Sequence, residues 1–113
     1  MSTGESTYDL FQRGREHLRA GLPAQATVAL EKAKRREPAK ASIREALGIA
    51  YFRIRRFEEA EREFRAMVEL HPVDDYAHFA LARCLEKLGR EDEAAGHYKL
   101  ARCLRPPRAE EEL

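Results

Sequence analysis

Three prolines, Pro38, Pro72 and Pro106, follow one another at a constant spacing of 34 residues. Other residue types keep the same spacing. A fixed period of this length predicts a stack of like helical units, in which each unit buries its apolar face against its neighbours. The further positions that recur at this spacing are Gly14, Gly48 and Ala82; Ala26, Ala60 and Ala94; and Leu30, Phe64 and Tyr98.

Each unit has the pattern of two helices joined by a tight turn. Ala, Leu, Glu, Arg and Lys dominate the composition, and these residues favour helices. Apolar residues recur at helical spacing on both sides of Arg55-Arg56, and Pro72 ends the second of these stripes. Asp74 or Asp75 can cap the helix that follows. The sequence therefore predicts helices over residues 7–20, 24–36, 41–54, 57–70, 75–88 and 91–104. It also predicts that Arg62 and Lys99 are exposed. The residues that it predicts to be buried are Leu47, Tyr51, Ala60, Phe64, Leu81 and Ala94.

The middle unit resembles the tetratricopeptide repeat, whose pattern is W-x2-L-G-x2-Y…A-x3-F…P. Leu47-Gly48, Tyr51, Ala60, Phe64 and Pro72 match it, whereas Leu10, Arg44 and His78 stand where the family has its leading Trp. The resemblance implies an all-α, right-handed solenoid of three helix-turn-helix units. We expect one domain over residues 7–108, with repeats at 7–40, 41–74 and 75–108. Residues 1–6 and the acidic segment 109–113 are expected to be disordered.

Small residues inside the helices predict close helix packing. Glycine costs about 1 kcal/mol relative to alanine in a helix, so Gly14 and Gly48 indicate that another helix comes near. We expect Ala26 and Ala60 to face them. Glycine also marks the turns of the first and third units, at Gly21 and Gly89, where a left-handed residue ends a helix. Arg55 holds that position in the second unit, which suggests a slightly different turn there, not a lost one.

Charge and motifs argue against several function classes. The chain has 21 basic and 20 acidic residues and a net charge of +1, which gives no overall field for nucleic acid or a membrane. Neither a run of about 20 apolar residues nor a basic leader before an apolar segment is present, so we expect a cytoplasmic protein. Nucleophile–base sets, phosphate loops and metal motifs are also missing from the sequence. We therefore expect no enzyme activity, no metal and no cofactor.

Histidine and cysteine give weak patterns. None of the four histidines has another His or Cys three or four positions along the chain, and His78 is interpreted as a packed or half-exposed ring. Cys84 and Cys103 are interpreted as small buried core residues, because free cysteine is often buried. A metal or redox role for the two cysteines stays open as the alternative.

The resemblance implies that the first helix of each unit lines a concave groove. Aromatic residues and arginine, the types enriched at binding hot spots, gather at those positions. They predict a protein or peptide partner with acidic and apolar side chains. The alternative is that some of the aromatic rings pack on a neighbouring helix and that the cations are merely solvated. The candidate binding residues are Tyr8, Phe11, Arg15, Arg19, Phe52, Arg53, Tyr76, Phe79, Arg83 and Lys87.

Two details refine this prediction. Arg19, Arg53 and Lys87 share one repeat position and are called here the basic ladder. One subfamily binds a C-terminal carboxylate through fixed polar residues, but of the matching positions in this chain only Arg15 is basic. The sequence therefore argues against that carboxylate clamp.

A second function class is assembly through the end of the solenoid. Glu91 and Arg102 are polar where the second unit has Phe57 and Val68, which indicates an outer face that needs no fourth unit. Apolar residues nearby, however, are expected to stay partly exposed. They form either an incomplete cap or a surface for a homo-oligomer through the C-terminal repeat. These residues are Tyr98, Leu100 and Leu104.

Overall fold

The computed structural model describes residues 4–105, which form six helices and no strand. Each predicted helix boundary lies within one residue of the observed one. Residues 1–3 and 106–113 lie outside the described range, and with them the acidic segment 109–113 and half of the N-terminal segment 1–6. The helices are α1 (Thr7–Arg19), α2 (Pro23–Arg36), α3 (Ala41–Arg53), α4 (Phe57–Leu70), α5 (Asp75–Lys87) and α6 (Glu91–Leu104).

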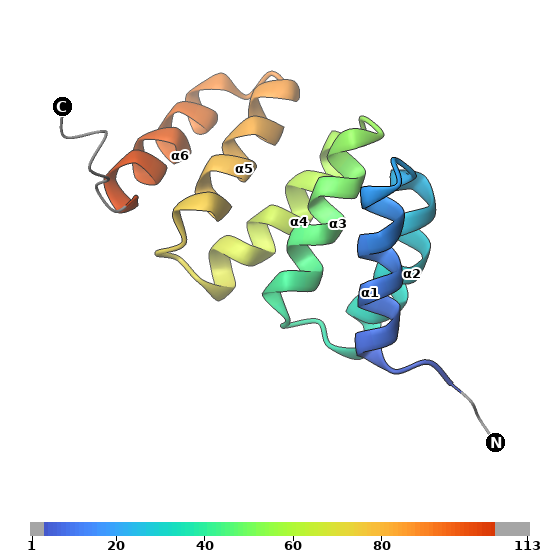
Figure 1. The fold of residues 1–113 in the computed structure, drawn as a ribbon. Helices are drawn as coiled ribbons and strands as arrows, with labels where there is room; N and C mark the ends of the chain where they lie inside the picture. Colours follow the sequence, from blue (N-terminus) through green and yellow to red (C-terminus); the bar gives the residue numbers. More distant parts are fainter. Residues whose placement is uncertain (1–3, 106–113) are drawn as a thin grey trace, which may run out of the picture.

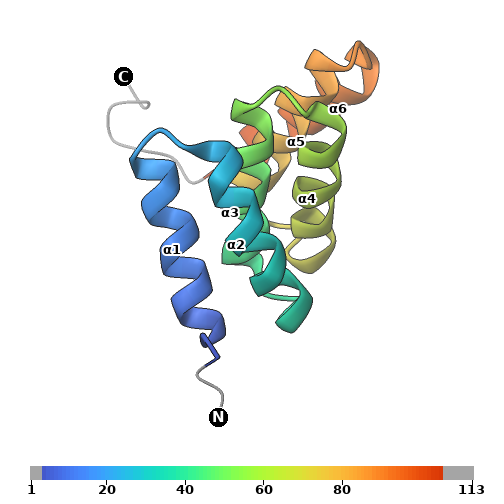
Figure 2. The same ribbon diagram turned by 90° about the vertical axis from the view of Figure 1, so that its right-hand side faces the viewer.

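Consecutive helices form three pairs, and the pairs stack along the chain (Figure 1). The described fold is therefore an all-α helical repeat solenoid, as the period predicted. The molecule is elongated, with extents of 56 × 32 × 26 Å. Figures 1 and 2 show the first helix of each pair, α1, α3 and α5, toward one side of the stack, with α2, α4 and α6 toward the other.

Side-chain caps begin two of the first helices. The Ser6 side chain accepts a hydrogen bond from the Asp9 backbone N–H, while the Asp9 carboxylate accepts from the Ser6 N–H, and together they close a capping box on α1. Asp74 caps α5 by accepting from the backbone N–H groups of Tyr76 and Ala77. These local bonds fix where each repeat begins.

The three turns within the repeats share one conformation. Gly21 and Gly89 have φ of 77° and 79°, and Arg55 has φ of 65°. In each turn the residue after this left-handed one donates its N–H to a carbonyl five positions back, as in a Schellman motif. The turn at Arg55 is retained, as predicted, because the surrounding bonds hold the arginine in nearly the conformation that glycine has elsewhere.

The core lies between the helices of each pair and between neighbouring pairs. The residues predicted to be buried are buried, and Arg62 and Lys99 are exposed as predicted. Cys84 is buried but Cys103 is exposed, so the second cysteine is not a core residue. The buried residues that the sequence predicted are Leu47, Tyr51, Ala60, Phe64, Leu81 and Ala94.

The mid-helix glycines make room for large side chains. A Cβ atom at Gly14 would lie 2.4 Å from Leu30 Cγ, and one at Gly48 would lie 2.5 Å from Phe64 Cζ. Each glycine accommodates a bulky side chain from the second helix of its own repeat. Whether Ala26 and Ala60 also face these glycines stays a prediction.

Candidate functional site

Two hollows lie on the face formed by α1, α3 and α5. The hollow between α1 and α3 has a volume of about 330 Å³, and the hollow between α3 and α5 has a volume of about 150 Å³. Ile49 lines both, so the hollows are neighbours, and together they are called the groove. The first hollow is lined by Phe11, Arg15, Leu18, Ser42, Glu45, Ala46 and Ile49. The second is lined by Ile49, Phe52, Arg53, Phe64, Tyr76, Phe79, Ala80 and Arg83.

Aromatic rings extend the groove toward the C-terminal end. Phe64 meets Tyr76 edge to face with ring centroids 6.3 Å apart, and Tyr76 lies 6.5 Å from Phe79. Phe79 in turn meets Tyr98 of α6 at 5.8 Å. Tyr76 and Phe79 also line a further hollow of about 350 Å³ between α5 and α6, together with Tyr98. The exposed fractions of Tyr76 and Phe79 are 38% and 43%, so the chain leaves much of this aromatic surface uncovered.

Two arginines lie over aromatic rings of the groove. The Arg15 guanidinium is 5.5 Å from the centroid of the Phe11 ring. The Arg83 guanidinium is 5.5 Å from the centroid of Phe52 and reaches that ring from the next repeat. These cation–π contacts keep positive charge beside apolar surface. A ligand in the groove would therefore contact positive charge and apolar surface at the same time.

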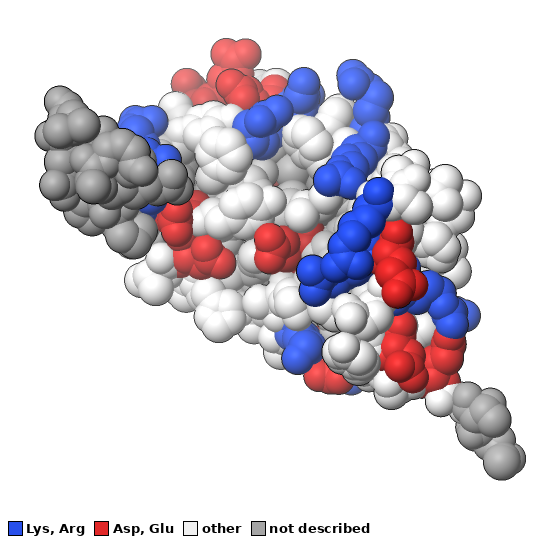
Figure 3. All heavy atoms as spheres, viewed as in Figure 1, with Lys and Arg blue, Asp and Glu red and all other residues white. Residues whose placement is uncertain are grey.

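The basic ladder lies along one edge of the same face. Arg19, Arg53 and Lys87 are the last residues of α1, α3 and α5, where a cation complements the helix dipole. All three are exposed. Arg53 Nη1 also donates to the Leu18 carbonyl at 3.3 Å, a bond that links α3 to the end of α1. Figure 3 shows basic side chains crowded along the upper part of this face.

Acidic groups lie within the groove as well. Glu45 lines the hollow between α1 and α3, and burial, with a further contribution from Asp74, raises the pKa of its carboxyl group. Arg15 opposes that shift and favours the ionised form. Figure 3 shows acidic side chains below the basic ones in the middle of this face, and a further acidic group at its upper edge. The groove is thus bipolar, with cations at the ends of the first helices and carboxylates nearer their starts.

Seven of the ten predicted binding residues line the hollows, and three lie outside both. The three are Tyr8, Arg19 and Lys87; Tyr8 is 67% exposed and its hydroxyl accepts a hydrogen bond from Gln12 Nε2 at 3.1 Å. The seven are Phe11, Arg15, Phe52, Arg53, Tyr76, Phe79 and Arg83.

Sequence reasoning missed two aromatic residues that second helices contribute. Phe64 of α4 lines the hollow between α3 and α5, and Tyr98 of α6 lines the hollow between α5 and α6. Both positions recur at the repeat spacing. The sequence predicts Phe64 to be a core residue and Tyr98 to be part of the exposed C-terminal end, and it assigns neither to the groove.

Within residues 4–105, no three His, Cys, Asp or Glu side chains gather closely enough to hold a metal ion. None of the six described helices is both long and apolar enough to cross a bilayer.

Comparisons with known proteins identify the repeat. The family model of the tetratricopeptide repeat matches residues 11–74 and again residues 45–109. Among curated proteins, Superkiller complex protein 3 of Mus musculus is 34% identical over 97 residues, which is 86% of this chain. The Homo sapiens protein of the same name is 32% identical over 97 residues. The chain spans only 6% of the length of either relative.

Solved structures share the fold. MamA AMB-1 is 28% identical with a TM-score of 0.83, and the match covers 88% of this chain and 59% of that one. A MamA mutant is 27% identical with a TM-score of 0.86, over 93% of this chain and 77% of the other. The second repeat domain of Spaghetti, bound to an HSP90 peptide, has a TM-score of 0.83 at 20% identity over 89% of this chain and 94% of its own. At that identity the likeness shows the fold alone.

Proposed function

The chain belongs to the tetratricopeptide repeat family, and from this premise we propose that it is a protein-interaction module that holds a peptide segment of a partner in the groove. The observation that carries the proposal is the exposed aromatic surface next to cations on the face of α1, α3 and α5. Tyr76 and Phe79 are only partly covered, and Arg83 and Arg53 line the same hollow.

The proposed peptide carries apolar and acidic side chains. An aliphatic or aromatic side chain would enter the hollow between α3 and α5, where Phe52 and Phe79 supply apolar walls. Acidic side chains would lie along the basic ladder. Exposed ion pairs contribute only about 0–1 kcal/mol each, so the aromatic residues should set the affinity. The cations should set the preference for acidic ligands and make association sensitive to salt.

The bipolar charge of the groove gives the peptide a preferred placement. The carboxylates of Glu45 and Asp74 would repel acidic side chains from the edge opposite the basic ladder. An acidic residue should therefore be favoured on the ladder side of the apolar anchor and disfavoured on the other side. Peptides with the same composition but different order should differ in affinity.

The experiment is an array of synthetic peptides that combine Leu or Phe with Asp or Glu in different orders, followed by calorimetry on the tightest binder. Phe79→Ala should weaken binding most, and Arg53→Glu should weaken acidic peptides selectively. Two control variants lie outside the groove: Arg62→Glu on the exposed face of α4 and Tyr8→Ala on α1. If both groove variants bind the peptide as tightly as the parent, the groove is not the binding site.

A second candidate function, assembly through the C-terminal end, is favoured by one observation. Leu100 of α6 is 45% exposed, and the hollow between α5 and α6 presents Tyr98 and Ala101 at the last repeat. Light scattering after size exclusion would show a concentration-dependent oligomer that Leu100→Glu disrupts. A monomer at all concentrations, in both the parent and this variant, would rule out self-assembly by this surface.

A further inference from the structure

One pair of facing positions, 19 residues apart, recurs in all three repeats with three different chemistries. In the first repeat the pair is apolar, and both side chains are buried in one cluster. In the second repeat the pair is an ion pair, and in the third it is two histidines. The pairs are Leu10 with Ala29, Arg44 with Glu63, and His78 with His97.

The second and third repeats place these side chains alike. Arg44 Nη1 donates to Glu63 Oε1 at 3.0 Å, and Arg44 Nε donates to the Pro38 carbonyl at 2.9 Å. His78 Nδ1 lies 3.0 Å from His97 Nδ1, and His78 Nε2 lies 2.7 Å from the carbonyl of Pro72, the equivalent proline. His78 thus takes the place of the arginine, and His97 takes that of the glutamate.

These contacts fix the number of protons that the histidine pair can hold. A carbonyl oxygen only accepts, so His78 Nε2 carries a hydrogen and donates it to Pro72. The bond between the two Nδ1 atoms needs one hydrogen between them. If both rings were charged, each Nδ1 would carry a hydrogen and neither could accept. The geometry therefore accommodates a neutral pair or a single positive charge, but not two.

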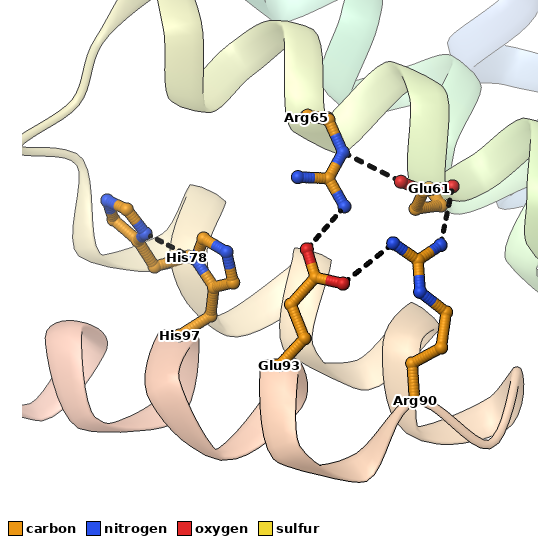
Figure 4. A network of polar contacts seen from close by, with 6 residues as sticks. All are labelled: Glu61, Arg65, His78, Arg90, Glu93 and His97. Atoms are coloured by element: carbon orange, nitrogen blue, oxygen red, sulfur yellow. Dashed lines mark hydrogen bonds and ion pairs between the residues drawn. The ribbon is translucent and has the colours of Figure 1, made fainter.

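The groups around the histidine pair do not stabilise a second positive charge on it. The exposed fraction of His78 is 4%. Burial, the neighbouring His78 and Arg65 of α4 all lower the pKa of His97, whereas Glu93 raises it. Arg65 and Arg90 both donate to the Glu93 carboxylate, at 2.9 Å and 2.6 Å, so its charge is already partly neutralised (Figure 4).

We propose that the His78–His97 pair makes the third repeat sensitive to pH, so that a second proton on the pair loosens α6 from α5 and weakens peptide binding in the groove. This inference rests on the proposed function for its binding step alone. In the second repeat the Arg44–Glu63 ion pair holds the same position.

The connection to the groove is direct. Phe79 and Tyr98 follow the two histidines in sequence, and their rings meet at 5.8 Å across the same pair of helices. Tyr98 also donates its hydroxyl to Glu86 Oε1 at 2.8 Å, another link between α6 and α5. A shift of α6 would therefore move Tyr98 away from Phe79 and deform the C-terminal part of the aromatic surface.

The direction of the pH effect follows from the lowered pKa of His97. An unfolded histidine has a pKa of about 6.5, above that of His97 in the folded chain. The unfolded state therefore takes up protons first as pH falls. The contribution of the histidine pair to the free energy of unfolding is therefore fully present above about pH 6.5, and it is lost as pH falls toward the pKa of His97 in the folded chain.

The first experiment needs no ligand. Thermal unfolding of the parent and of two variants is measured at pH 7.5 and at pH 5.0. The variant His97→Gln removes one titrating ring. The double variant His78→Arg, His97→Glu introduces the ion pair of the second repeat. Between pH 7.5 and pH 5.0 the melting temperature of the parent should fall by about 5 °C more than that of either variant. His71→Gln, at an exposed histidine outside the pair, should behave like the parent. An equal loss in parent and His97→Gln would overturn the proposal, even if the double variant failed to fold.

The second experiment measures the binding step. Calorimetry with the tightest-binding peptide of the array should give a dissociation constant for the parent that is at least threefold larger at pH 5.0 than at pH 7.5. The dissociation constant of His97→Gln should be the same at both pH values. If the melting temperature responds to pH through the pair but affinity does not, the coupling to the groove is wrong. If the parent binds no array peptide at pH 7.5, the proposed function fails, and the melting comparison still decides whether the pair senses pH.

Discussion

Replacing Gly48 with alanine tests whether the repeat core is built around missing Cβ atoms. An alanine Cβ there would lie 2.5, 2.7 and 2.8 Å from three atoms of the Phe64 ring. Ordinary contacts between carbon atoms are about 3.5–4.0 Å. Phe64 is 2% exposed and its ring also meets Tyr76, so the ring cannot move aside without disturbing the next repeat.

Two opposing terms set the size of the effect. Alanine is favoured over glycine in a helix by about 1 kcal/mol. Overpacking a filled core costs about 1–3 kcal/mol, and a clash with three ring atoms belongs at the upper end. We expect Gly48→Ala to lower the free energy of unfolding by about 1–2 kcal/mol.

A second glycine supplies the matched control. Gly96 is exposed in the middle of α6, and a Cβ atom there would meet no heavy atom within 4 Å. Gly96→Ala should therefore raise the free energy of unfolding by about 0.5–1 kcal/mol through helix propensity alone. Urea unfolding of both variants, followed by circular dichroism, isolates the packing term as their difference. If Gly48→Ala were as stabilising as Gly96→Ala, the argument that glycine makes room for Phe64 would be refuted.

Three further predictions test other parts of the fold. Arg55→Gly should raise the melting temperature, because an arginine held in the left-handed region costs about 1–2 kcal/mol that glycine avoids. Glu63→Ala should lower the free energy of unfolding by about 3 kcal/mol, because Glu63 is 4% exposed and its loss leaves Arg44 without a carboxylate partner, whereas Lys34 keeps Glu31; urea unfolding would measure this. Iodoacetamide at pH 8 should add one label to the native chain, at the exposed Cys103, since burial raises the pKa of Cys84 to about 12; mass spectrometry should find a second label only after denaturation.

The 34-residue period predicted the helix boundaries, because the recurring residues include both those that end helices and those that form the core. Proline cannot continue a helix, so Pro38 and Pro72 placed the ends of α2 and α4. The turn at Arg55 could not be predicted in the same way. Its left-handed conformation is imposed by the bonds around it, above all the hydrogen bond from the Arg56 N–H to the Tyr51 carbonyl, and not by the preference of arginine.

The candidate site was predicted less completely, because the pattern of one helix does not show what a neighbouring helix contributes. Positions on α1, α3 and α5 could be read from repeat numbering, and seven of them line the hollows. The ring of Phe64 and the approach of His97 to His78 depend on contacts between helices. An offset of 19 residues links the facing positions, and comparison at that offset would have found the histidine pair.

Differences between the repeats, more than their likeness, shape the surface of the groove. Phe64 packs deeply because Gly48 opposite it has no Cβ. In the third repeat Ala82 stands at the position of Gly48, and Tyr98 stands at that of Phe64. We expect the Cβ of Ala82 to prevent the ring of Tyr98 from packing as deeply as that of Phe64. Tyr98 is half-buried, with its ring against Phe79 and the hollow between α5 and α6. In the second repeat the equivalent ring is part of the core, whereas in the third it adds partly covered aromatic surface that extends the groove beyond the first helices.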